Sequence, residues 1–140
     1  MYDRILVPLD GSALAETALP FAELIPSRDV RLFVVEPAAA EPNSAAARWQ
    51  GMPPAAYLAA VAAPLERQGR TVERVVEGGA PAERIVAAAG DADLIVMATR
   101  GLGQRQGVRL GSVADAVARR APVPTLLIRG NDLPGPPAIA

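Results

Sequence analysis

A repeated alternation of short apolar runs with segments of helical periodicity is the feature of this sequence that most constrains its fold. Between the runs, residues 12–24 and 81–89 place apolar side chains on one helical face. Strands that are apolar throughout and separated by helices are typical of a parallel sheet covered on both faces. The five runs of strand length lie at residues 4–9, 30–35, 71–76, 94–98 and 125–128. We therefore expect an α/β fold with a five-stranded, parallel, doubly wound sheet and helices on both faces, which is a Rossmann-like arrangement.

The remaining segments suggest how the chain is organised around this sheet. Residues 37–54 are rich in Ala, Pro, Asn and Ser and carry the only tryptophan, Trp49, so we expect a long loop there. A helix is expected at 54–68, in which Pro64 removes one backbone hydrogen bond and should kink the last turn. A chain of 140 residues is long enough for one core. We expect one domain over residues 1–129 and a disordered tail over 130–140, where three prolines follow Gly-Asn-Asp.

The residue types that are absent exclude several kinds of chemistry. The chain contains no Cys, no His and no Lys, so that all basic charge is Arg. This removes thiol nucleophiles, imidazole bases, Cys/His metal sites and the lysine of a P-loop. A net charge of −1 and a pI near 5.4 argue against a nucleic-acid partner. The apolar runs are too short for a membrane span or a signal peptide, so we expect a cytoplasmic protein without a membrane partner.

Residues 94–114 form the segment that most resembles a ligand site. The apolar run opens into a glycine-rich loop that closes on Gly111 and Ser112 before an amphipathic segment, and backbone N–H groups at Gly101, Gly111 and Ser112 could hold phosphates. The segment also carries three arginines and no acidic residue: Arg100, Arg105 and Arg109. The alternative is a plain connection followed by a capped helix, because Ser112 and Asp115 resemble a capping box. The two interpretations are compatible.

Asp10 is the second candidate residue, because it directly follows the first apolar run. Ligands of an open parallel sheet bind outside the carboxyl ends of the strands, where the winding reverses. Asp10 could accept hydrogen bonds from a sugar hydroxyl or a base amino group there, or it could only form an Asx turn beside the cap residue Ser12. Asp91 and Asp93 precede the fourth run and should lie at the opposite edge, which excludes a catalytic carboxylate pair at the crevice.

Several colinear motifs together resemble the universal stress protein family. They occupy residues 5–12, 79–82, 93–101, 111–114 and 121–128, and the likeness extends over residues 2–129. The family has an adenine nucleotide α-hydrolase-like fold, and its ATP-binding branch holds phosphates with a Gly, two residues, a Gly, nine residues and then Gly-Ser or Gly-Thr. Gly101, Gly111 and Ser112 match this pattern, whereas Ala98 stands at the first glycine position and Arg100 at a position that is often His.

The resemblance implies a set of cofactor-binding residues. Asp10 and the backbone of Pro8 and Leu9 would face the adenosine, and Val35 would meet the adenine. The cofactor is expected to be ATP with Mg²⁺ held through the phosphates, with no metal ligand and no catalytic residue supplied by the chain. The residues assigned to the cofactor in this way are Pro8, Leu9, Asp10, Val35, Met97, Ala98, Arg100, Gly101, Gly111, Ser112 and Val113.

The resemblance also implies an assembly and a role. It predicts a homodimer formed through the last strand, Pro124 to Ile128. Pairing of this apolar edge strand with its symmetry mate would satisfy the backbone groups of both copies. The expected role is a dimeric stress-response sensor or regulator that binds an adenine nucleotide and hydrolyses it slowly at most. Two alternatives remain: a dimeric interaction module of the same family that binds no nucleotide, favoured by Ala98 and Arg100, and an enzyme that cleaves ATP between its α and β phosphates.

Overall fold

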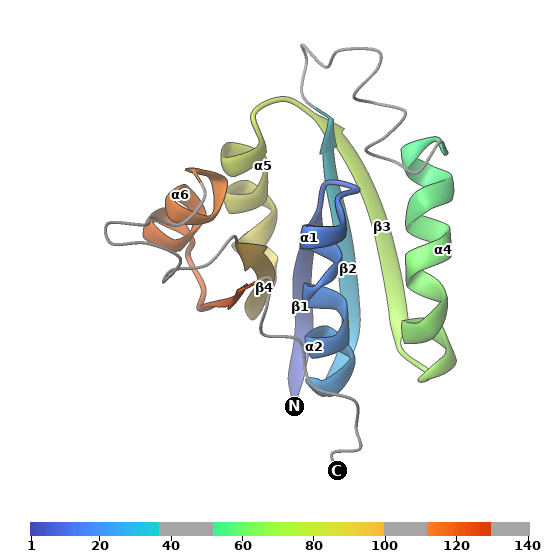
Figure 1. Cartoon of the computed structure of the whole chain (residues 1–140). Helices are drawn as coiled ribbons and strands as arrows, with labels where there is room; N and C mark the ends of the chain where they lie inside the picture. Colours follow the sequence, from blue (N-terminus) through green and yellow to red (C-terminus); the bar gives the residue numbers. More distant parts are fainter. Residues whose placement is uncertain (37–51, 100–111, 130–140) are drawn as a thin grey trace.

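The five apolar runs form the strands of one all-parallel sheet in the order β3-β2-β1-β4-β5. The computed structural model describes residues 1–36, 52–99 and 112–129 (Figure 1). The strands are β1 (Tyr2–Leu9), β2 (Ser27–Glu36), β3 (Thr71–Gly78), β4 (Leu94–Thr99) and β5 (Thr125–Arg129). The expected α/β fold with a parallel, doubly wound sheet is confirmed. Residues 37–51 of the loop expected at 37–54, and the tail expected at 130–140, lie outside the described residues.

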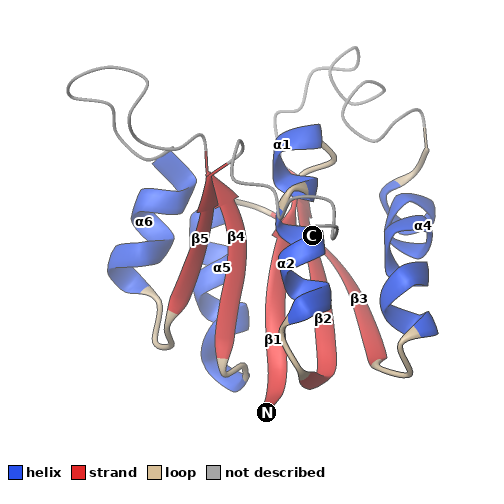
Figure 2. Ribbon diagram, turned by 60° about the horizontal axis from the view of Figure 1, so that its bottom comes forward, coloured by secondary structure: helices blue, strands red, loops and turns tan. Residues whose placement is uncertain are grey.

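Helices cover both faces of this sheet (Figure 2). Residues of α2 and α4 pack in one core cluster with the sheet, and residues of α5 and α6 pack in the other. The one-turn helix α1 lies beside the carboxyl end of β1, and a 3-10 turn, η1, follows α5 (Figure 1). The bounds are α1 (Ala13–Glu16), α2 (Ala18–Leu24), α4 (Pro54–Arg67), α5 (Pro81–Ala88), η1 (Ala89–Asp91) and α6 (Ser112–Arg120).

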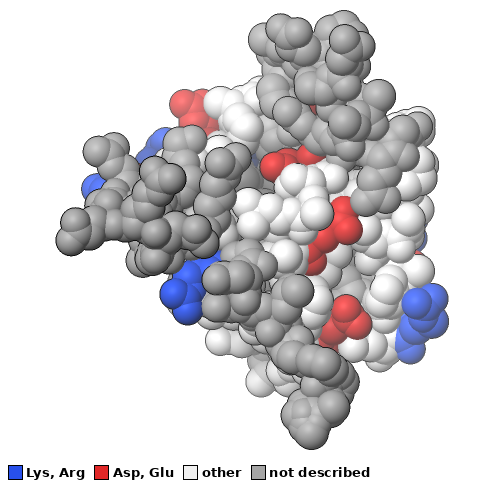
Figure 3. All heavy atoms as spheres, in the orientation of Figure 1, with Lys and Arg blue, Asp and Glu red and all other residues white. Residues whose placement is uncertain are grey.

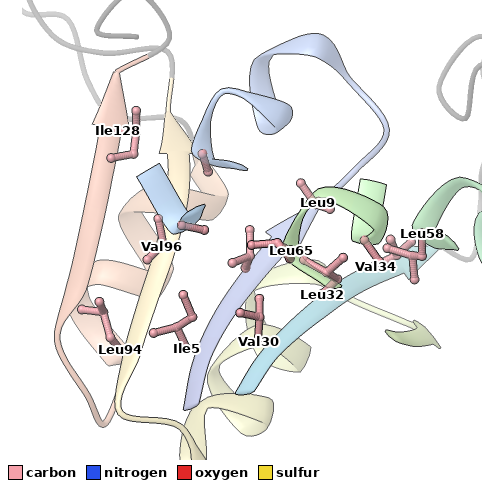
Figure 4. Packing of buried hydrophobic residues seen from close by; sticks show 14 of the residues in the cluster. Ile5, Leu9, Val30, Leu32, Val34, Leu58, Leu65, Leu94, Val96 and Ile128 are labelled. Atoms are coloured by element: carbon pink, nitrogen blue, oxygen red, sulfur yellow. The ribbon is translucent and has the colours of Figure 1, made fainter. Parts of the chain in front are cut away.

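Successive side chains along a strand point to opposite faces of the sheet, so each strand contributes to both core clusters. Ile5, Val7 and Leu9 of β1 point into the cluster beneath α2 and α4, whereas Leu6 points into the cluster beneath α5 and α6. All four side chains are at most 4% exposed. The first cluster runs across β2, β1 and β4 and reaches Ile128 of β5 (Figure 4). Because both faces are covered, the central strands are apolar over residues 5–9, 32–35 and 94–98, which is the pattern that predicted them.

The segment of helical periodicity over residues 12–24 is helical, and it is divided into the two helices α1 and α2. The break falls at Thr17, whose hydroxyl and backbone N–H both donate to the carbonyl of Leu14, at 2.6 and 3.0 Å. Pro20 explains why the first helix does not continue, because proline has no N–H to donate to the carbonyl of Glu16. Pro20 instead lies in the first turn of α2, where no intrahelical donor is needed.

The other predicted helices begin and end within a residue or two of their expected positions. α4 starts with a proline in its first turn, Pro54, and continues through Pro64 to Arg67, so that Pro64 is accommodated inside the helix. It buries Tyr57, Leu58 and two further side chains against the sheet. The helix therefore covers β2 and β3 in spite of its internal proline.

An ion-pair network joins three strands and η1 at the amino edge of the sheet. Arg31 of β2, with a side chain only 12% exposed, donates from Nη1 and Nη2 to the two carboxylate oxygens of Asp91 at 2.7 and 3.2 Å. Arg31 Nε also donates to Glu73 of β3, and Arg4 Nη1 of β1 donates to Asp91 Oδ2 at 2.9 Å. The pKa of Asp91 is lowered, chiefly by the hydrogen bond from Arg31.

The second aspartate of this region stabilises the start of the central strand. Asp93 Oδ2 accepts the backbone N–H groups of Asp3 and Arg4, both at 3.0 Å. Asp91 and Asp93 thus lie at the amino edge, as expected, and both carboxylates have structural partners there.

Replacement of Asp91 by Asn should reduce stability most at neutral pH. The folded chain holds this pKa below the ordinary value of 3.8, so the charged carboxylate stabilises the fold above that value, and the stabilisation is lost as pH falls through the lowered pKa. Because Asp91 is 61% exposed, solvent screens the effect, and we expect urea unfolding at pH 7 to show a loss of about 0.5–1 kcal/mol. The difference from wild type should shrink as the pH falls below about 4.

Asp3→Asn is the matched control, because that carboxylate is 80% exposed and forms one long ion pair, 3.6 Å from Arg28. It should change stability less than Asp91→Asn does. Equal losses in the two variants at pH 7 would contradict a special contribution of the network.

Candidate functional site

The reversal of winding falls between β1 and β4. The chain runs from β1 outward to β2 and β3, and then returns to the other side of β1 with β4 and β5. β1 and β4 pair through Ile5 with Leu94 and Leu6 with Ile95, that is, at the middle of β1 and the start of β4. The strands end at a common edge (Figure 2), where Asp10 follows β1 and Thr99 ends β4. This edge is the position at which open α/β sheets bind ligands.

Asp10 combines a local structural role with an available carboxylate oxygen. Its Oδ1 accepts the backbone N–H of Ser12 at 2.9 Å and the Ser12 hydroxyl at 2.5 Å. This is the predicted Asx turn, and it passes through Gly11 at φ +83°, which favours glycine. Among the described residues, Asp10 Oδ2 has no hydrogen-bond partner, and the side chain is exposed. A ligand donor could therefore bind Oδ2 without disturbing the turn.

Ser12 caps α1, as the alternative interpretation of this turn predicted. Its hydroxyl oxygen accepts the backbone N–H of Ala15 at 3.1 Å, and its own backbone is extended, with φ −82° and ψ 154°. The loop after β1 thus uses Asp10 to orient Ser12 and Ser12 to begin α1.

The apolar residues of the predicted set divide between the two faces of the sheet. Val35 and Met97, 7% and 5% exposed, lie near the ends of β2 and β4 in the cluster beneath α5 and α6. Val113 of α6 is partly buried against the same cluster. Pro8 and Leu9 are buried at the end of β1. Four of these residues thus lie in the carboxyl halves of the central strands: Pro8, Leu9, Val35 and Met97.

Ala98 has an extended backbone conformation that any residue can adopt. It lies within β4, pairs with Ile128 of β5, and packs its methyl group against the cluster beneath α2 and α4. Strand conformations have negative φ, so a side chain at this position causes no backbone strain. The substitution of alanine for the family's first glycine is compatible with this fold.

The remaining predicted residues are described only in part. Arg100, Gly101 and Gly111 lie outside the described ranges, as do the other two arginines of that loop. Ser112 is the first residue of α6, and its side chain is not among those described.

Two residues near the site were missed from the sequence. Tyr57 of α4 is fully buried, and its hydroxyl donates to Glu16 Oε2 of α1 at 2.7 Å. The pKa of Tyr57 is raised well above its usual range, first by burial, then by the hydrogen bond to Glu16 and by the negative charges of Glu16 and Asp10. A single tyrosine in an alanine-rich helix was the available signal, because a buried tyrosine hydroxyl needs a partner.

The charge around the site favours some ligand groups over others. Acidic side chains follow the face that carries α1 and α2 (Figure 3). Asp10 and Glu16 lie at the site end of this segment, whereas Glu23 lies at the far end of α2, where its carbonyl accepts from Arg70. Negative charge repels phosphate groups but suits hydroxyl and amino donors. The described residues beside β1 therefore suit hydroxyl and amino donors better than phosphate groups.

No metal site or membrane helix is found within the described ranges. The described side chains include no group of three or more acidic, histidine or cysteine residues that could hold a metal ion. None of the helices in residues 1–36, 52–99 and 112–129 is long and apolar enough to span a membrane.

The fold and the edge site define a Rossmann-like α/β domain with a ligand position at the winding reversal. Comparison with known proteins identifies the family within this class of fold: the model of the universal stress protein family matches residues 1–129. The chain belongs to that family.

Individual relatives agree with this assignment. A universal stress protein of Thermus aquaticus is 38% identical over 138 residues, which cover 92% of this chain and all of that protein. A hypothetical protein whose function was assigned from its structure, in a test case of structural genomics, has a TM-score of 0.74 at 26% identity, over 92% of this chain and 96% of the other. A universal stress protein in complex with cAMP has a TM-score of 0.70 at 26% identity, over 93% and 98% of the two chains.

Replacement of Ser12 by Ala should destabilise the protein by about 1 kcal/mol, because the first N–H groups of α1 lose their cap. Ser12→Thr keeps an oxygen cap and should lose less than half of that. Urea unfolding followed by circular dichroism measures both. Equal losses in the two variants would contradict the capping role.

Proposed function

We propose that this protein binds an adenine nucleotide, ATP with Mg²⁺, at the carboxyl edge of β1 and β4, and acts as a dimeric stress-response sensor or regulator. The observation that carries the proposal is the Asp10 carboxylate, which keeps one oxygen without a partner among the described residues at the winding reversal. A ribose hydroxyl or an adenine amino group is a donor of the kind that this oxygen would bind.

The surrounding residues suit the parts of such a nucleotide. Val35 and Met97 lie near the ends of the strands that flank β1, where an adenine ring could pack against the small part of each side chain that the core leaves exposed. The related universal stress protein solved with cAMP, 26% identical, binds an adenine nucleotide. Ala98 adds no backbone strain, which removes one argument for the alternative without nucleotide binding.

The phosphates would lie toward the start of α6. Backbone N–H groups at the amino end of this nine-residue helix carry partial positive charge, and Gly101 and Gly111 are the proposed further contacts. Mg²⁺ would be bound by phosphate oxygens. Since the chain has no His, Cys or Lys to act as base or nucleophile, any hydrolysis should be slow.

Asp10→Ala should weaken binding of ATP·Mg²⁺ about tenfold or more, because it removes a charged acceptor. Calorimetric titration of protein stripped of co-purified nucleotide measures the Kd. Asp3→Ala removes an equal charge at the opposite edge and should leave the Kd unchanged. No binding by the wild type at about millimolar ATP, the weakest affinity worth testing, would overturn the proposal and favour the interaction module.

The proposed dimer would pair β5 with its symmetry mate. β5 is an edge strand, and its Leu126 is 38% exposed. An unpaired apolar edge is a ready template for strand addition, and a two-fold axis would satisfy both copies.

Leu126→Arg should therefore shift the protein from dimer to monomer in sedimentation velocity, because two arginines would face each other across the two-fold axis. Val76→Arg is the matched control, since Val76 is 39% exposed on β3 at the other edge of the sheet. Dissociation by Val76→Arg but not by Leu126→Arg would assign the interface to the wrong edge and contradict the β5 dimer.

A further inference from the structure

We propose that Tyr57 is a positioning residue for the nucleotide site: its hydroxyl, through Glu16 and the one-turn helix α1, holds Asp10 in its binding position. The inference rests on the proposed function and names a residue that the family pattern does not include.

The contacts form a continuous path from α4 to the end of β1. Tyr57 donates to Glu16 Oε2 at 2.7 Å, and Glu16 ends α1 with its backbone N–H bonded to the carbonyl of Ser12 at 3.3 Å. Ser12 in turn donates twice to Asp10 Oδ1, at 2.9 and 2.5 Å. Every link between the buried tyrosine and the exposed aspartate is thus a hydrogen bond or one turn of backbone.

α1 depends on such an anchor because it has little packing of its own. It has four residues and buries none of them. Helices this short are unstable in isolation, since a single turn fixes several backbone angles for one or two hydrogen bonds. Tyr57 is fully buried in α4 and anchored by the core cluster, so its hydroxyl gives this short helix a fixed contact.

The charge of Asp10 also acts on the Tyr57 hydroxyl. The charge of Asp10 contributes to the raised pKa of Tyr57, after burial and Glu16. The hydroxyl therefore stays protonated and donates to Glu16 throughout the neutral range. Displacement of α1 would move Ser12 and, with it, the carboxylate of Asp10.

This arrangement predicts an effect confined to the part of the ligand that Asp10 contacts. Tyr57→Phe keeps the buried ring and removes only the donor. ATP·Mg²⁺ should bind about fivefold more weakly, which corresponds to the loss of one hydrogen bond of about 1 kcal/mol. Tripolyphosphate·Mg²⁺, which has no adenosine, should bind the variant and the wild type equally.

The matched control is Tyr2→Phe, which removes the hydroxyl of the chain's other tyrosine, 41% exposed at the amino end of β1. It should leave both affinities unchanged. Glu16→Gln keeps an oxygen acceptor and should bind ATP nearly as the wild type does, whereas Glu16→Ala should reproduce Tyr57→Phe. The Glu16 pair also tests the proposal if Tyr57→Phe fails to fold.

A double-mutant cycle separates positioning from general destabilisation. If Tyr57 acts through Asp10, Tyr57→Phe should have no further effect on ATP affinity in the Asp10→Ala background. Additive effects, an unchanged Kd in Tyr57→Phe, or an equal loss of tripolyphosphate binding would overturn the inference while the proposed function stands. Absence of ATP binding by the wild type and Tyr2→Phe alike would instead overturn the proposed function and this inference together.

Discussion

Burial of the sheet on both faces is the constraint on which the rest of this structure depends. Ile5 and Leu6 are neighbours in β1, yet both are fully buried because each faces a different layer of helices. Two covered faces leave only the edges of the sheet for polar chemistry, since a charged group between the layers would lose its hydration without a partner. The reversal of winding at β1 then selects one of these edges as the ligand position.

The two ends of the central strands have opposite properties. At the amino edge, Arg31 binds Asp91 through two nitrogens, and Asp93 accepts two backbone N–H groups, so the charges there have partners within the fold. At the carboxyl edge, Asp10 uses one oxygen for its own turn and has no partner for the other among the described residues. Polar groups whose hydrogen bonds are satisfied within the protein stabilise the fold, whereas an exposed acceptor that follows a rigid strand can recognise a ligand.

Sequence patterns predicted most of the sheet and part of the site. All five strands were found near their expected bounds. For the central strands the reason is that the parts covered on both faces are runs of apolar residues. The Asx turn at Asp10 and the cap at Ser12 were predicted because both depend on neighbours in the chain. The break at Thr17 was not predicted, although Pro20 was its local signal. The bond from Tyr57 to Glu16 joins residues 41 positions apart, and no local pattern reports such a pair.

By itself, the sequence determined the alternation of strands and helices, the parallel sheet and the colinear motifs of the universal stress protein family, because these follow from periodicity and from residues close together in the chain. Tertiary structure alone decided that Ala98 lies in an unstrained strand, that Arg31 joins β2 and β3 to Asp91, and that α4 reaches α1 through a buried hydroxyl. Those features depend on which elements the sheet order brings side by side, and strand order is set by packing across the whole domain rather than by any one segment.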